Sequence, residues 1–217
     1  GMSQGRIVRF EEITRCPLEM QDTLLSVLSD RVMAIPEMKD SNRSLFAANG
    51  FNVIATANTR DRGVNEMSAA LKRRFNFETI PAIASLKQEM ELVKRETERM
   101  LQQSKIPLTL APDAAEVIVT VFRELRNAQT SEGKALEPIG AAMSTAEAVS
   151  TAYAASVHAW YCGEGTVTPA QLAQYVAASA LKESPDDRKR LKHYFRNALK
   201  ERASGFWKGF AEAGGDL

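Results

Sequence analysis

The composition of the chain changes near residue 85, and no other feature of the sequence constrains the fold as much. Before this point, short apolar runs rich in branched residues alternate with turn residues; after it, long segments repeat apolar residues every three or four positions. The first pattern favours strands and the second favours helices. The sequence therefore predicts an α/β part over residues 1–85 and an all-helical part over residues 86–217.

The α/β part is predicted to contain a small parallel sheet. Phe51–Ala57 (FNVIATA) is an uninterrupted apolar run, which is typical of a buried parallel strand, and Arg6–Phe10 is a second short strand. Two extended pieces around a polar turn predict a hairpin over Val32–Phe46. The remaining elements expected here are a helix over residues 17–30, a short helix over residues 65–73 and a last strand over Phe77–Ile80, which Pro81 ends.

The helical part is predicted to contain about five helices. Asp113 is expected to cap the second of them, and Thr168 with Pro169 is expected to cap and open the fourth. The last helix is predicted to run over residues 185–213, because apolar residues recur there at helical spacing, and Gly205 and Gly209 are expected to weaken its final turns.

Charge and cysteine content exclude several classes of protein. The 28 Lys and Arg nearly balance the 27 Asp and Glu, whereas a nucleic-acid domain usually carries a basic excess. The basic stretch over residues 182–202 is more typical of a solvated amphipathic helix than of a nucleic-acid site. Only Cys16 and Cys162 occur, with no CxxC pair, and no apolar run is long enough to span a membrane. We expect a cytoplasmic protein without a membrane or nucleic-acid partner.

The first candidate site residues are two carboxylates, Glu11 and Glu12, directly after the opening strand. Ligands of open α/β sheets bind at the carboxyl ends of the strands. One carboxylate there can hold Mg²⁺, and a second can activate a water molecule. The pair taken alone is more typical of a solvated strand end, or of a first-turn complement to a helix dipole.

Two further signals lie after the next parallel strand. Asn58 follows the apolar run and would reach the same edge of the sheet, although asparagine is also common in plain turns. Arg73 and Arg74 lie at the end of the short helix over residues 65–73. A guanidinium at this place can reach a phosphate bound by a neighbouring subunit, or can simply complement the helix dipole.

The order of these signals resembles the core of AAA+ ATPases, and specifically the MoxR-like branch. FEEITR at residues 10–15 resembles the Walker B strand and the segment directly after it, FNVIATAN at residues 51–58 resembles the sensor-one strand, and AALKRRF at residues 69–75 resembles the arginine-finger helix. The hairpin resembles the one that precedes sensor one in that branch. The resemblance is specific over residues 7–81, and the helical part resembles the family's lid in architecture.

This resemblance implies a role for each candidate residue. Glu12 corresponds to the water-activating glutamate, Asn58 to sensor one, and Arg74, or Arg73 in second place, to the arginine finger. Glu11 stands where most members have a magnesium-associated aspartate. The lid stretch over residues 141–147 contains no sensor-two arginine. The implied cofactors are ATP and Mg²⁺.

The 217 residues contain no phosphate-binding loop of the form GxxxxGK[ST]. Gly133 and Lys134 form the only Gly-Lys pair, and Ala135 follows them. We therefore expect a C-terminal fragment or a truncated product, whose uncovered strands pair anew or are covered by another copy of the chain.

Two functions are compatible with these expectations. The first is a part of a MoxR-like ATPase that forms a hexameric ring and remodels or assembles partner proteins, including ones with von Willebrand A domains, while this chain alone is inactive. The second is a non-catalytic AAA+ remnant that serves as a protein-binding module.

Overall fold

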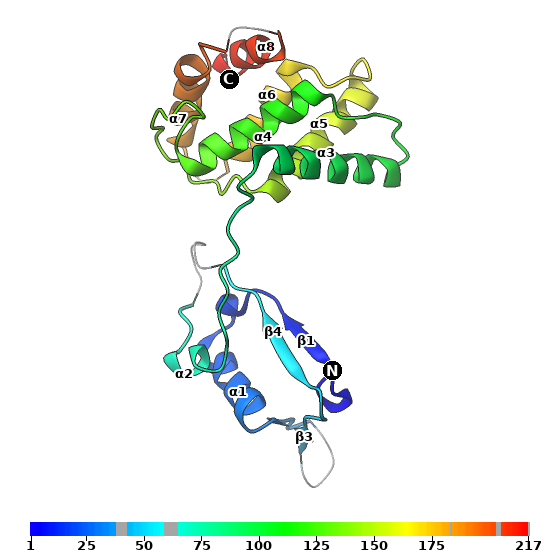
Figure 1. Ribbon diagram of the computed structural model, residues 1–217, viewed down its shortest axis with the longest axis vertical. Helices are drawn as coiled ribbons and strands as arrows, with labels where there is room; N and C mark the ends of the chain where they lie inside the picture. Colours follow the sequence, from blue (N-terminus) through cyan, green and yellow to red (C-terminus); the bar gives the residue numbers. More distant parts are fainter. Residues whose placement is uncertain (38–42, 59–64, 183, 203–204, 217) are drawn as a thin grey trace. The chain divides into compact units, whose positions relative to one another are not determined.

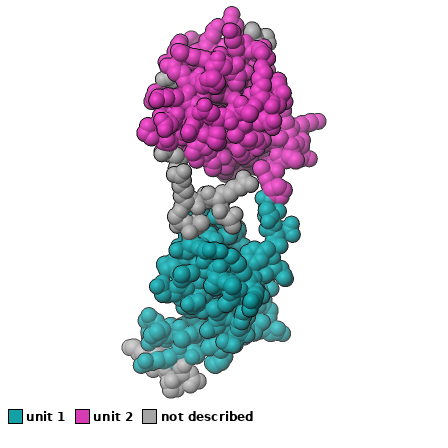
Figure 2. Space-filling view, turned by 90° about the vertical axis from the view of Figure 1, so that its left-hand side faces the viewer, with its two compact units in different colours: residues 1–80 teal, residues 81–217 magenta. Residues whose placement is uncertain are grey.

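The computed structural model describes residues 1–37, 43–58, 65–182, 184–202 and 205–216. The chain divides into two compact units, unit 1 over Gly1–Ile80 and unit 2 over Pro81–Leu217 (Figure 2). Each unit has hydrophobic clusters of its own. The expected α/β class, with a parallel sheet, a hairpin and an all-helical second part, is confirmed.

The sheet of unit 1 consists of two parallel strands that lie side by side in Figure 1, β1 (Ile7–Phe10) and β4 (Asn52–Ala55). Their register pairs Ile7 with Asn52 at one end and Phe10 with Ala55 at the other. Two strands that are far apart in the sequence can run parallel only through a crossover, which helix α1 (Leu18–Ser29) and the hairpin supply here.

One face of this sheet packs on α1, and the other face is exposed. Val8 and Val53 pack in a cluster with Val27 of α1, and Phe10 and Ala55 pack in a second cluster with leucines of the same helix. The alternate residues Ile7 and Ile54 face away, with 64% and 55% of their surface exposed. This alternation follows from the period of two along a strand.

The hairpin expected over Val32–Phe46 is confirmed. Strands β2 (Val32–Ala34) and β3 (Ser44–Phe46) pair antiparallel, while residues 38–42 of the expected turn lie outside the described residues. The other elements of unit 1 are the short helices η1 (Met2–Gln4), η2 (Ile13–Arg15) and α2 (Ala69–Lys72).

The prediction of a strand over Phe77–Ile80 is wrong. These residues form no regular element, and Phe77 and Ile80 are 63% and 89% exposed. A strand needs a hydrogen-bonded neighbour, and the described part of unit 1 offers none beside this stretch. Of the two outcomes expected for the uncovered strands, pairing anew is not found, since β4 pairs with β1 and no described strand pairs with its other edge. Cover by another copy of the chain stays a prediction.

Unit 2 is all-helical, as Figure 1 shows. Its first helices match the expected spans closely, because their apolar positions recur at helical spacing. The elements are α3 (Leu86–Gln103), α4 (Pro112–Asn127), α5 (Thr145–Cys162), α6 (Pro169–Ala180), α7 (Asp187–His193), the π-helix η3 (Tyr194–Ala198) and α8 (Gly205–Gly215).

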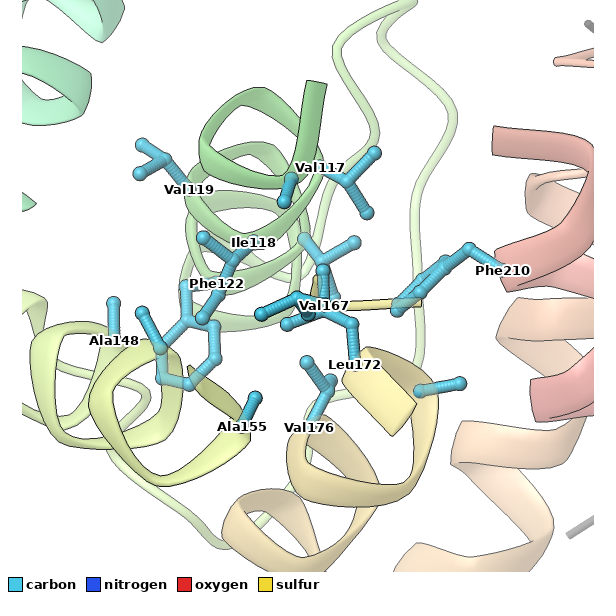
Figure 3. Close-up of a cluster of buried hydrophobic side chains, with 14 of the residues drawn as sticks. Val117, Ile118, Val119, Phe122, Ala148, Ala155, Val167, Leu172, Val176 and Phe210 are labelled. Atoms are coloured by element: carbon cyan, nitrogen blue, oxygen red, sulfur yellow. The ribbon is translucent and has the colours of Figure 1, made fainter. Parts of the chain in front are cut away.

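The core of unit 2 forms where α4 lies against α5, α6 and α8 (Figure 3). Almost the whole circumference of α4 is buried, which is expected for a central helix. The fully buried side chains that meet there are Val117, Ile118 and Phe122 of α4, Ala155 of α5, Leu172 and Val176 of α6, and Phe210 of α8.

The helix starts agree with the sequence in one case and differ in another. Thr168 caps α6 in a reciprocal pair with Gln171, and Pro169 opens the helix, as expected. Asp113 does not cap α4. Ala111 holds the cap position and Pro112 the first helical position, so Asp113 lies in the first turn, where its charge complements the helix dipole.

The prediction of a single last helix over residues 185–213 is wrong, because this stretch is divided into α7, η3 and α8. The helix widens to a π-helix at Tyr194, and α8 starts at Gly205, whose φ of 55° suits glycine far better than other residues. The break lets α8 turn back and pack on α6 and η3 instead of continuing into solvent. None of the described helices is long and apolar enough to cross a membrane.

Candidate functional site

The carboxyl ends of β1 and β4 meet at one edge of the sheet. The ladder continues past both strands, because the amide of Thr56 donates to the carbonyl of Phe10 and the amide of Ile13 donates to the carbonyl of Thr56, each over 2.9 Å. The amide of Glu12 donates to Thr56 Oγ1 over 3.1 Å. The backbone that carries Glu11 and Glu12 therefore lies beside the stretch that leads to Asn58.

Glu12 occupies an unusual backbone conformation. Its φ is 52° and its ψ is 51°, in the left-handed region, and it precedes the short helix η2. A non-glycine residue pays roughly 1 kcal/mol for this conformation, which persists where the surroundings hold it. The hydrogen bonds that the amides of Glu12 and Ile13 donate to Thr56 provide part of that hold.

Both carboxylates face solvent, and each is paired with a nearby arginine. The guanidinium of Arg9 donates from Nε to Glu11 Oε1 over 2.9 Å, and Arg15 forms an ion pair with Glu12. The side chains of Glu11 and Glu12 are 60% and 53% exposed. Pairs this exposed contribute little to stability, so these carboxylates can exchange partners readily.

The basic end of α2 is held at a distance from Glu12 within one chain. Arg74 donates from Nε to Ser29 Oγ over 3.0 Å and from Nη1 to the carbonyl of Ala70 over 3.1 Å. Ser29 ends α1, whereas Glu12 precedes the start of this 12-residue helix, which is about 18 Å long at 1.5 Å per residue. Arg73 is exposed and makes no ion pair with a described residue.

The residues present suit a hard cation in their chemistry. Mg²⁺ prefers carboxylate oxygens and is commonly held by one or two of them together with water and substrate phosphates. Glu11 and Glu12 offer exposed oxygens of this kind. The described residues contain no group of three or more acidic, histidine or cysteine side chains that could form a complete cage.

A buried charge cluster in unit 2 is the feature that sequence reasoning missed. Glu89 of α3 has a side chain only 1% exposed, and it accepts from Arg123 Nη1 over 2.8 Å and from Arg126 Nη2 over 3.1 Å. The hydroxyl of Thr145 donates to it over 2.6 Å. Burial raises the pKa of Glu89, but the hydrogen bonds from Thr145 and Arg123 and the charge of Arg126 outweigh burial and leave the pKa below its ordinary value.

This cluster places an arginine beside the stretch over residues 141–147, where the sequence has none. Arg126 donates from Nη1 to the carbonyl of Met143 over 3.0 Å, directly before α5 begins. Arg123 donates to the carbonyls of Ile83 and Ala84 over 2.8 Å, which ties the start of unit 2 to α4. The sequence carried one signal, because the arginines interrupt the apolar face that contains Phe122 and Leu125.

Comparison with known proteins identifies both units. Residues 1–75 match the AAA domain of the dynein-related subfamily, and residues 87–212 match the YehL-like AAA+ ATPase C-terminal domain. The two units described above are therefore those of an AAA+ protein. Since the second match spans more than half of the chain, the chain belongs to the YehL-like AAA+ ATPases.

One relative and two solved structures of another protein illustrate the likeness. The uncharacterized protein YehL of Escherichia coli (strain K12) is 47% identical over 213 residues, which are 98% of this chain and 59% of that protein. The chain thus spans less than two thirds of this relative. Crystal structures of NtrX from Brucella abortus with ADP and with ATP each give a TM-score of 0.53 at 16% identity, covering 96% of this chain and 44% and 48% of NtrX. At that identity the likeness concerns the fold alone.

Proposed function

We propose that this chain is the part of a MoxR-like AAA+ ATPase that carries the water-activating and sensing residues. The parent activity is hydrolysis of Mg²⁺-ATP coupled to the remodelling or assembly of partner proteins. The observation that carries the proposal is the parallel register of β1 and β4, which sets the backbone of Glu12 beside the stretch that leads to Asn58. In this proposal residues 1–85 are the partial core and residues 86–217 the lid.

Glu12 is proposed to accept a proton from the attacking water. Its carboxylate is exposed and is held by the exposed Arg15, so exchanging this partner for water costs little. A positioned general base contributes about 10²–10⁴ in rate. Asn58, which is exposed and lies three residues beyond β4, is proposed to orient the same water or a phosphate through its amide.

Glu11 is proposed to hold Mg²⁺, directly or through water, since its oxygens suit that cation. The metal, when bound with ATP, offsets the charge of the phosphates. Glu11 has one methylene more than the aspartate usual at this place in the family. Arg9, which now binds Glu11, has to release it for this role.

Arg74 is proposed as the arginine finger, with Arg73 as the second candidate. The separation of Arg74 from Glu12 along α1 supports action on a neighbouring subunit rather than within one chain. The proposal therefore includes a homo-oligomer, as is usual in the AAA+ family, and a hexameric ring as its form. The clients proposed are proteins that such a ring remodels, including ones with von Willebrand A domains.

The experiment compares this chain with a longer form. We expect no ATP hydrolysis from the purified 217 residues, because they contain no GxxxxGK[ST] to hold the phosphates. The coding DNA upstream of Met2 is read for an in-frame GxxxxGK[ST], and the form extended to include it is assayed for phosphate release. Turnover that Glu12→Gln lowers about 10²-fold or more supports the proposal. Equal turnover in Glu12→Gln and the parent form contradicts it.

A non-catalytic binding module is the second candidate. Phe46, at the end of the hairpin, is 63% exposed, which suits a protein contact. The absence of a phosphate-binding loop from these residues and the glutamate at position 11 also favour this candidate. The module predicts that no upstream extension restores turnover and that Phe46→Ser, but not Glu12→Gln, weakens the retention of a partner protein.

A further inference from the structure

The turn over residues 12–16, which carries Glu12, is held from two sides. On the first side, the amide of Glu12 donates to the hydroxyl of Thr56, and the amide of Ile13 donates to the carbonyl of Thr56. These bonds fix where the turn begins. They do not fix its far end, which has to be held by other groups if Glu12 is to keep one orientation.

The far end is held by two side-chain amides that converge on one carbonyl oxygen. Asn65 Nδ2 donates to the carbonyl of Cys16 over 3.0 Å, and Gln21 Nε2 donates to the same oxygen over 3.1 Å. The backbone amide of Asn65 donates to the carbonyl of Thr14 over 2.6 Å. Thr56 and Asn65, one before and one after Asn58 in the sequence, therefore both bind the turn that carries Glu12.

The two amides differ in their surroundings. Gln21 is fully buried, and its Oε1 has no hydrogen-bond partner among the described residues. Gln21 is a buried residue of α1, so its amide moves only with that helix and acts as a fixed anchor. Asn65 is exposed and lies in the segment over residues 65–68 that leads into α2. It is the anchor that moves with this segment.

Apolar packing adds to the same connection. Ile13 of the turn is 1% exposed and packs in one cluster with Met67 and Leu71, which follow Asn65 in the chain. The stretch from Asn65 to Leu71 thus touches the turn through hydrogen bonds at its start and through side chains further on. A shift of this stretch would move the turn with it.

We propose that Asn65 is a positioning residue for Glu12, which holds the turn over residues 12–16 in the orientation that the carboxylate needs. The catalytic part of this inference rests on the proposed function. The structural part does not, because it concerns the turn alone. Asn65 acts through Glu12 and is not assigned a contact with substrate.

The structural part is tested on the 217-residue chain by amide hydrogen exchange measured by NMR. In Asn65→Asp an acceptor replaces the Nδ2 donor opposite the carbonyl of Cys16, while the size of the side chain is kept. We expect the amides of Arg15 and Cys16, which close the turn, to exchange about tenfold faster, as the loss of one hydrogen bond implies. The amides in the middle of α1 should be unchanged.

Asn76→Asp is the matched control, because Asn76 is exposed, lies beyond α2 and undergoes the same change of charge. If Asn65→Asp fails to fold, Asn65→Ala removes the same donor to Cys16 without adding a charge and is expected to accelerate the same two amides. Unchanged exchange at Arg15 and Cys16 in a folded Asn65→Asp variant overturns the proposal.

The catalytic part is tested in the extended form that hydrolyses ATP. Asn65→Asp should lower kcat about tenfold and leave the KM for ATP unchanged, since only the orientation of Glu12 is affected. Combined with Glu12→Gln it should cause no further loss, because both changes act on one carboxylate. Faster exchange with an unchanged kcat overturns the catalytic role alone. The absence of any Glu12-dependent turnover in the parent form overturns the proposed function, and the catalytic role with it.

Discussion

The hydroxyl of Tyr194 donates a hydrogen bond of 2.7 Å to Oε2 of Glu124, although the two residues are 70 positions apart. Both side chains are buried, and Arg202 Nη2 donates to the other oxygen of Glu124 over 2.6 Å. The guanidinium of Arg202 also lies 4.7 Å from the centre of the Trp207 ring. This network joins α4 to the π-helix and α8, and the π-helix and α8 are the elements that the sequence did not place correctly.

Tyr194 should not ionise while the chain is folded. Burial raises the pKa of Tyr194 well above its ordinary value, and the negative charge of Glu124 raises it further. We expect the native chain and Tyr194→Phe to show the same increase in phenolate absorbance up to about pH 11, one unit above the ordinary pKa of tyrosine. A larger increase in the native chain before it unfolds would contradict this assignment.

The same bond should matter for stability. Tyr194→Phe leaves Oε2 of Glu124 with one partner fewer, which should lower the free energy of unfolding by about 1–3 kcal/mol at neutral pH. Because the folded pKa is raised, the contribution of Tyr194 is full below the unfolded value of about 10 and is lost as the pH rises further. Urea unfolding at pH 7 measures the difference in stability between the native chain and Tyr194→Phe. The same measurement at pH 10.5 shows how far that difference has decreased. Tyr161→Phe is the control, since Tyr161 is 70% exposed.

Glu89 should stabilise unit 2 at neutral pH and lose this effect in acid. Glu89→Gln removes the charge between Arg123 and Arg126 and should lower the free energy of unfolding by about 3 kcal/mol. The folded pKa of Glu89 is lowered, so the difference from the native chain is full above the unfolded value of about 4.3 and shrinks as the pH falls below it. Urea unfolding from pH 7 to pH 3 measures this difference.

The control for that series is Glu116→Gln, which removes a carboxylate from an exposed position of α4. Its free energy of unfolding should stay within about 0.5 kcal/mol of the native chain at every pH. A Glu89→Gln variant that behaves like Glu116→Gln would show that the buried cluster adds no net stability.

Gly214 should be required for the packing of α8. A Cβ atom at this position would overlap the ring of Phe195, whereas a Cβ at Gly215 would make only an ordinary contact with Arg196 at 3.5 Å. Gly214→Ala should therefore cost about 1–3 kcal/mol through overpacking, while Gly215→Ala stays within about 0.5 kcal/mol of the native chain. Thermal unfolding of the two variants checks this prediction. Equal stabilities would show that position 214 of α8 is not packed tightly against Phe195.

The arginine finger should act between subunits. In the ATP-hydrolysing form, Arg74→Ala should lower turnover about 10³-fold. Mixing Arg74→Ala subunits with Glu12→Gln subunits should restore part of the turnover, because some interfaces then combine an intact Glu12 with an intact Arg74. Arg73→Ala in the same assay decides between the two arginines. Failure of the mixture to recover any activity, for both arginines, contradicts a role between subunits.

Local patterns were enough to predict the strands and helices whose partners lie within this chain. The run at Phe51–Ala57 and the strand at Arg6–Phe10 form a parallel pair, and the cap at Thr168 opens α6. The stretch Phe77–Ile80 also carries aromatic and branched residues but forms no strand, because strand formation needs a neighbour. Because the carboxyl ends of parallel strands meet at one edge of a sheet, the sequence predicted that Glu11 and Glu12 lie beside the stretch after β4. Their chemical roles remain predictions.

The sequence by itself determined the division into an α/β part and a helical part and the positions of most helix starts, because these depend on residues within a few turns of each other. The tertiary structure alone decided which distant side chains meet. Glu89 with Arg126 and Glu124 with Tyr194 come from different helices, and Asn65 reaches the turn of Glu12 from the segment after β4. No local pattern specifies such contacts, since each depends on how whole elements pack.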